Sequence, residues 1–101
     1  MIPSMAVLLD DLAASQPDIS AAPIGGSTTW SRAGQAFVAM GPSGVELRLD
    51  RAIAAAAART PDAGPSSRGP DWVRFNPHEL DGHAVDRLTA WFDLAYRFAG
   101  S

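Results

Sequence analysis

The two histidines are the residues of this chain whose side chains most readily suggest chemistry. His78 and His83 are five positions apart, with Glu79, Asp81 and Asp86 close by in the sequence. Imidazole and carboxylate groups bind zinc and transfer protons, but a metal site requires that such side chains converge on one point. A five-residue step across a turn does not by itself achieve this. We therefore expect no metal site at this position.

Other motifs for catalysis or cofactor binding are also missing from the sequence. Ser43, Ser66 and Ser67 lack the glycine pattern of a nucleophile elbow, so we read them as solvated loop serines. The glycines at 25–26 and 41–44 match neither dinucleotide nor phosphate-loop spacing, and are typical of turns. The chain has no cysteine, which excludes disulfides and thiolate metal sites. The sequence predicts a protein that is not an enzyme and that holds no cofactor.

One candidate binding surface combines tryptophans and arginines at alternating positions of expected strands. Its members are Trp30, Arg32, Arg48, Trp72 and Arg74, with Glu46 beside them. Strand alternation would place them on the sheet face opposite the helices. Aromatic rings beside guanidinium groups suit protein interfaces and also single-stranded nucleic acids. The structural alternative is that the tryptophans complete the core while the arginines are solvated or pair with the glutamate.

Composition limits the kinds of protein and partner. The 101 residues are 47% hydrophobic and 19% charged, which fits a single domain over residues 1–101. Every basic residue is arginine and alanine is abundant, as in proteins from GC-rich bacterial genomes. A net charge of -3 argues against strong non-specific binding to nucleic acid, because that affinity comes from neutralising phosphates.

The first apolar run of the sequence bears on the cellular location of the protein. Residues 5–9 lack a basic leader and are interrupted by Asp10 and Asp11. The run is therefore neither a signal peptide nor long enough to span a bilayer. We expect a cytoplasmic protein with no membrane partner.

The last third of the chain organises the expected fold. Leu88, Phe92 and Ala95 belong to an apolar stripe with helical spacing, which predicts a helix over 82–99. Asp81 is placed to cap its start and Gly100 to end it. Just before it, polar and apolar residues alternate over 71–76, which predicts a strand with one buried face.

The remaining elements follow from apolar period and from turn residues. We expect helices over 4–15 and 51–59, capped by Ser4 and Asp50, and strands over 28–32, 36–40 and 45–49. Breaker residues predict loops over 17–27 and 60–69, the latter with a very short strand around 66–67. The sequence therefore predicts an α+β protein.

This order of elements, together with several local patterns, resembles the MmcQ/YjbR-like family of small bacterial proteins. The patterns are Arg32-x-Gly34-x-x-Phe37, Glu46-Leu47-Arg48-Leu49-Asp50, Gly69-x-x-Trp72-Val73-Arg74-Phe75, Leu80-Asp81 and Ala95-Tyr96-Arg97. The resemblance covers residues 5–99 and implies a two-layer α+β fold, a curved antiparallel sheet covered by helices, similar to secretion chaperones. It also implies a DNA-binding role, as suggested for that family, and it transfers no catalytic residue. The acidic balance, the lack of lysine and the Pro/Ser-rich 60–69 segment depart from the family pattern.

Two functional hypotheses remain open from the sequence. The physics of an acidic chain favours a non-catalytic protein-interaction module, with a protein partner or self-association through the Trp/Arg face. The family resemblance favours a nucleic-acid-binding module that uses the arginines of the same face.

Overall fold

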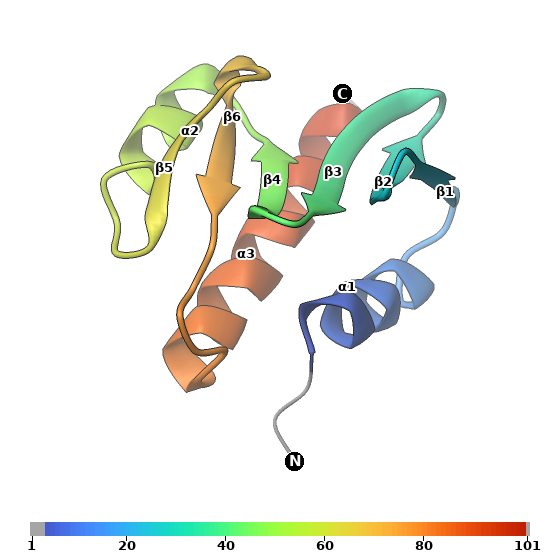
Figure 1. Cartoon of the computed structure of the whole chain (residues 1–101). Coiled ribbons are helices and arrows are strands. Elements are labelled where there is room, and N and C mark those ends of the chain that lie inside the picture. The colour runs from blue at the N-terminus through green and yellow to red at the C-terminus, as the bar shows by residue number, and fades with distance from the viewer. Residues whose placement is uncertain (1–3, 101) are drawn as a thin grey trace.

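The computed structural model describes residues 4–100, and within them the chain forms three helices and six strands (Figure 1). The helices are α1 (Met5–Ala14), α2 (Arg51–Ala57) and α3 (Gly82–Ala99). The strands are β1 (Ile19–Ile24), β2 (Ser27–Arg32), β3 (Gln35–Gly41), β4 (Gly44–Arg48), β5 (Ala63–Ser66) and β6 (Gly69–Phe75). The predicted fold class, α+β with an antiparallel sheet covered by helices, is confirmed.

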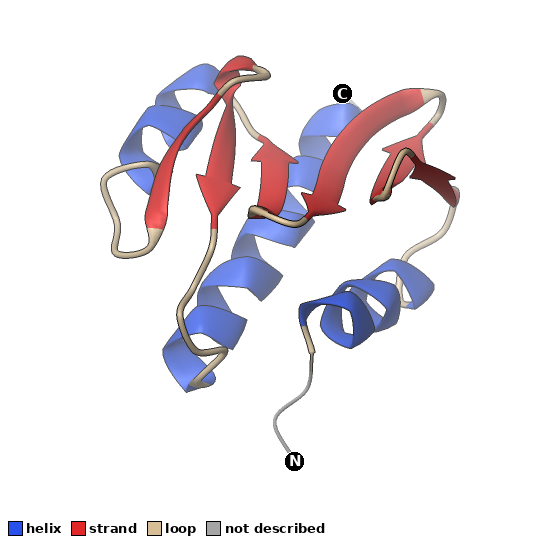
Figure 2. Cartoon of the chain, viewed as in Figure 1, coloured by secondary structure: helices blue, strands red, loops and turns tan. Residues whose placement is uncertain are grey.

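The six strands form one sheet in the order β1-β2-β3-β4-β6-β5, and all neighbours are antiparallel. Figure 2 shows the sheet as a curved layer with α3 running behind its middle strands. No helix within residues 4–100 is both long and apolar enough to cross a membrane.

The helix α3 begins and ends as its sequence predicts. The Asp81 carboxylate accepts a hydrogen bond from the backbone N–H of Ala84 at 2.9 Å, and Gly100 is the C-cap. A carboxylate at this position satisfies a free N–H group and interacts favourably with the helix dipole. Most of the predicted apolar stripe is buried, Val85 and Phe98 are half-buried, and Leu94, which the sequence also assigned to the stripe, is exposed.

Aromatic rings join α3 to the sheet. Phe37 of β3 meets Phe92 edge-on at 5.5 Å between ring centroids, and it meets Tyr96 in the same way at 6.1 Å. Phe75 of β6 meets Trp91 at 5.1 Å. Edge-to-face contacts of this kind add to the free energy gained by burial. The core therefore lies between α3 and strands β3, β4 and β6.

The two shorter helices are also capped as predicted. The Ser4 hydroxyl accepts from the N–H of Val7 at 3.2 Å, and the Asp50 carboxylate accepts from that of Ala52 at 3.1 Å. Helix α2 ends two residues earlier than expected. Its buried residues are Ala54 and Ala57, whose small side chains let the helix approach β6 closely.

The prediction of a loop over 17–27 is wrong, because Ile19–Ile24 pairs with β2. The connecting residues Gly25 and Gly26 have φ of +55° and +86°, as required by the type I′ turn of a two-residue hairpin. This Gly-Gly pair was the signal in the sequence. The strand itself shows no apolar alternation because β1 is an edge strand, and Ser20 to Pro23 are exposed.

The prediction of a loop over 60–69 with a very short strand around 66–67 is wrong in part, because the strand covers Ala63–Ser66 and forms the other edge of the sheet. Its residues Gly64 and Pro65 are strand breakers by composition. Proline is tolerated at a sheet edge, where its missing N–H is not needed. A Cβ at Gly64 would lie 3.3 Å from Nη2 of Arg74, so glycine there leaves room for the arginine.

Candidate protein-interaction surface

The register of β4 and β6 defines the face of the sheet that the helices leave uncovered. Leu47 pairs with Val73, and both are fully buried on the side of α3. Alternation along the strands therefore places the pairs Glu46–Arg74 and Arg48–Trp72 on the opposite face. Four of the six residues singled out in the sequence lie together there.

Trp30 does not belong to this open face, and its expected placement there is wrong. It pairs with Val38, and Val38 pairs with Leu47, so the three residues share the helix-facing side. Trp30 is 1% exposed and is part of the hydrophobic core. A shift of register by one residue moves a side chain to the other face, and the sequence does not specify this register.

Arg32 follows Trp30 by two positions and likewise lies on the helix-facing side of the sheet. The prediction that it lies on the open face is therefore wrong. Its Nη1 donates to the backbone carbonyl of Tyr96 at 2.8 Å, and its guanidinium carbon lies 3.9 Å from the centroid of the Tyr96 ring. The last four carbonyls of a helix have no partner within the helix. Arg32 satisfies one of them.

Arg48 starts on the open face but extends to the end of the sheet near the last turn of α3. Its Nε donates to Asp71 Oδ2 at 3.0 Å, and its Nη1 donates to Gln35 Oε1 at 3.0 Å. Its guanidinium carbon lies 4.9 Å from the centroid of the Phe98 ring. These contacts join β6, β3 and α3, so its charge is largely occupied within the molecule.

Five residues lie together at one end of the open face, and we call them the Trp72 face: Glu46, Ser66, Arg68, Trp72 and Arg74. The Glu46 carboxylate accepts from the hydroxyl of Ser66 and from Nε of Arg68, the latter at 3.1 Å. The guanidinium carbon of Arg68 lies 5.2 Å from the centroid of the Trp72 ring. Within residues 4–100, the guanidinium of Arg74 has no hydrogen-bond or ion-pair partner.

The rest of the open face is made of small side chains. Glu46 pairs with Ala39 of β3, Ala39 with Thr29 of β2, and Thr29 with Ala22 of β1. These residues continue the same row across the sheet. Among the described strand residues on this face, Trp72 is the only aromatic one, and Ala39 beside Glu46 is only 2% exposed.

Arg68 was missed at the level of sequence. It lies in the turn between β5 and β6, within the stretch expected to be a loop. The signal was Gly69, whose φ of +147° belongs to a tight connection, because a hairpin there would bring residue 68 beside Trp72. Because strand β5 was not predicted from the sequence, no hairpin with β6 was expected, and Arg68 could not be placed beside Trp72.

The histidines lie apart from the Trp72 face. His78 and His83 are both exposed on either side of Asp81, whose carboxylate caps α3. Residues 4–100 contain no group of three or more histidine or acidic side chains arranged to hold a metal ion. Ser43 and Ser67 are exposed as well, and Ser66 belongs to the Trp72 face.

Comparisons of the chain with family models, with curated proteins and with solved structures found no match. The resemblance to the MmcQ/YjbR-like family therefore stays a prediction. The α+β fold and the Trp72 face rest on the structure of this chain.

Proposed function

We propose that this chain is a non-catalytic domain that binds another protein through the Trp72 face. The observation that carries the proposal is the arrangement at Trp72. Its ring is half-buried on the uncovered face of the sheet with Arg68 over it, and the nearby Arg74 has no partner within residues 4–100.

The chemistry of the Trp72 face resembles that of interface anchors. Tryptophan and arginine are the residues most enriched among those that dominate binding energy at protein interfaces. Arg68 is held by Glu46, which fixes its guanidinium beside the ring, so little side-chain freedom is lost when a partner binds.

The nucleic-acid alternative has less support. Its phosphate contacts were expected from Arg32, Arg48 and Arg74, and binding of this kind grows with the number of phosphates neutralised. Arg32 is bound to α3, and Arg48 is bound to Asp71 and Gln35. Of the three, only Arg74 is unpaired within the described residues.

The proposal predicts that Trp72→Ala removes binding of the partner. The wild type, Trp72→Ala, Arg74→Ala and the control Leu94→Ala, an exposed apolar residue of α3, are immobilised in turn and exposed to a cell extract. Proteins retained by the wild type and the control but lost from both face variants are purified and titrated. We expect Trp72→Ala to weaken their affinity about tenfold or more, because truncating an interface anchor costs more than about 1–2 kcal/mol.

Equal retention by all four proteins would contradict the proposal. The nucleic-acid alternative is measured separately by fluorescence anisotropy with short single- and double-stranded DNA at low and moderate salt. DNA binding that weakens steeply with salt and disappears in Arg74→Ala would favour that alternative instead.

A further inference from the structure

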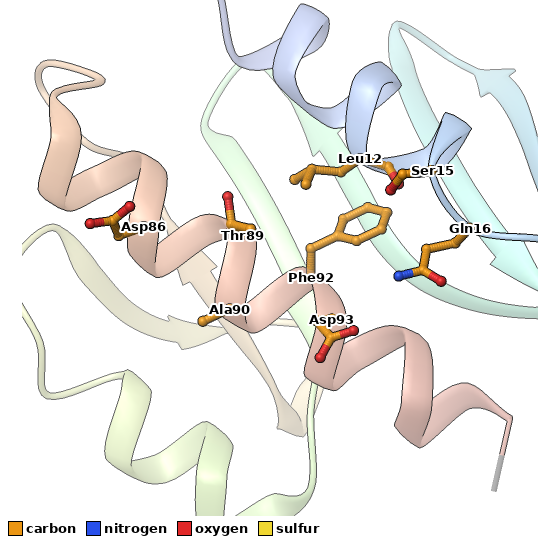
Figure 3. Close-up of a pocket in the computed structure, with 8 residues that line it drawn as sticks. All are labelled: Leu12, Ser15, Gln16, Asp86, Thr89, Ala90, Phe92 and Asp93. Atoms are coloured by element: carbon orange, nitrogen blue, oxygen red, sulfur yellow. The ribbon is translucent and has the colours of Figure 1, made fainter.

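A groove lies between α1 and α3, on the other side of the molecule from the Trp72 face. Its volume is about 420 Å³. The residues that line it are Leu12, Ser15 and Gln16 at the end of α1, and Asp86, Thr89, Ala90, Phe92 and Asp93 of α3 (Figure 3). Ligand pockets generally range from about 300 to 1,000 Å³, so this groove is large enough for one or two side chains. A whole helix, about 10 Å across, does not fit.

The groove has an apolar floor and an acidic rim. Figure 3 shows the ring of Phe92 pointing toward Leu12 and α1, with Asp86 and Asp93 further along α3 in either direction. Residues seven positions apart lie on one face of a helix and are about 10 Å apart along its axis. The two carboxylates therefore stand at opposite ends of the part of α3 that lines the groove.

The charge around the α1–α3 groove is negative and largely uncompensated. No basic side chain lines it. Within residues 4–100 Asp86 has no ion-pair or hydrogen-bond partner, and Asp93 pairs with Arg97 at 3.1 Å. That pair is weak, because the Arg97 side chain is 74% exposed and such surface pairs contribute little. Helix α1 adds acidic residues and contains no base.

We propose that the α1–α3 groove binds a segment of a partner protein that presents an arginine or lysine side chain. The occupant follows from charge complementarity and shape. The methylene stem of such a residue covers apolar surface while its charged end stays at the rim, where Asp86 or Asp93 accepts its hydrogen bonds. Ser15, Thr89 and Gln16 supply further polar atoms for the backbone of the segment. This site is independent of the Trp72 face.

A labelled peptide of alternating leucine and arginine tests the assignment. Its matched control carries citrulline, the neutral isostere, at each arginine position. We expect the arginine peptide to bind at least about tenfold more tightly, which corresponds to one charge-assisted hydrogen bond. In a ¹H–¹⁵N spectrum of the native protein, its titration should move the amide signals of the end of α1 and the middle of α3. Equal affinity of the two peptides, or shifts located elsewhere, would overturn the proposal.

Variants of the rim supply the second test. Asp86→Asn and Asp93→Asn should each weaken binding of the arginine peptide several-fold. Asp62→Asn makes the same change of charge next to the edge strand β5 and should leave binding unchanged. If Asp62→Asn weakens binding as much as the rim variants, the loss of affinity reflects the net charge of the protein, and the assignment of the peptide to the groove is wrong. Competition by free spermidine at the peptide's own concentration would assign the groove to a soluble amine and overturn the peptide proposal.

Discussion

Two arginines hold the C-terminal end of α3. Arg32 donates to the carbonyl of Tyr96, and Arg48 lies over the ring of Phe98. The unpaired carbonyls of a helix end carry partial negative charge, so cations there are stabilising. A Cβ at Gly100 would collide with the guanidinium of Arg32, which shows how closely the arginine is packed. Strands β2 and β4 thus contact α3 through arginine side chains at the end of the helix as well as through the hydrophobic core.

We predict that Arg32→Ala lowers the free energy of unfolding by about 1–2 kcal/mol. The substitution removes a hydrogen bond from a charged donor and its contact with the Tyr96 ring, and both are only partly buried. Urea denaturation followed by circular dichroism measures the change. Arg97→Ala, which breaks only the exposed pair with Asp93, should cost less than about 0.5 kcal/mol. Equal losses in the two variants would show that Arg32 is not a helix-end contact.

At the residue scale, the sequence predicts local roles well and long-range roles poorly. Ser4, Asp50 and Asp81 cap their helices as expected, because a cap depends on groups within three positions along the chain. Trp30 and Arg32 were placed on the wrong face, because their position depends on how β2 aligns with β3. That alignment includes a shift between Trp30 and Ser31, which no local pattern reveals.

At the scale of elements, α3 is the helix on which the core depends. We predict that Phe92→Ala costs about 3–5 kcal/mol, because Phe92 is fully buried against Phe37 and its removal leaves a cavity. Chemical denaturation provides the measurement. Leu94→Ala, at a position exposed on the same helix, should cost about 1 kcal/mol or less. A loss below 1 kcal/mol for Phe92→Ala would mean that the Phe37–Phe92 contact is not part of the core.

The elements that the sequence missed are the two edge strands. The strands β3, β4 and β6 pack against α3, so their apolar residues alternate or cluster and can be recognised. The strands β1 and β5 each have one free edge and, apart from the isoleucines at the two ends of β1, consist of alanine, glycine, serine and proline. Such composition is typical of loops. These segments form strands because their backbones pair with those of the neighbouring strands β2 and β6.

At the scale of the whole molecule, the two layers present different chemistry. The sheet exposes the Trp72 face with the unpaired Arg74, and the helices form a groove rimmed by Asp86 and Asp93. The two proposed sites lie in opposite layers, so binding at one leaves the other accessible. Their separation also makes the two proposals testable one by one, since a variant of either site leaves the other intact.

Each edge strand of the sheet contains a proline. Ile24 and Ser27 flank the two-residue turn and form a hydrogen-bonded pair, so Pro23 directs its nitrogen away from β2, toward the open edge. Pro65 occupies the other edge strand. A proline on an edge removes a donor that another chain would need, which is a common protection against aggregation. Pro23 therefore makes the β1 edge less suited to pairing with another strand.

We predict that Pro23→Val makes the domain associate through β1. The substitution supplies an outward N–H in a residue type that favours strands, beside the outward backbone groups of Ile19 and Ala21, so two copies of β1 can pair. Sedimentation velocity over a range of concentrations should show a rise in average mass for the variant beyond that of the wild type. Pro42→Ala removes an exposed proline from the β3–β4 turn and serves as the control. Association through any other surface is common to the wild type and both variants, so only a difference in mass between the proteins reports on the β1 edge. Identical sedimentation of the two variants would show that Pro23 does not protect this edge.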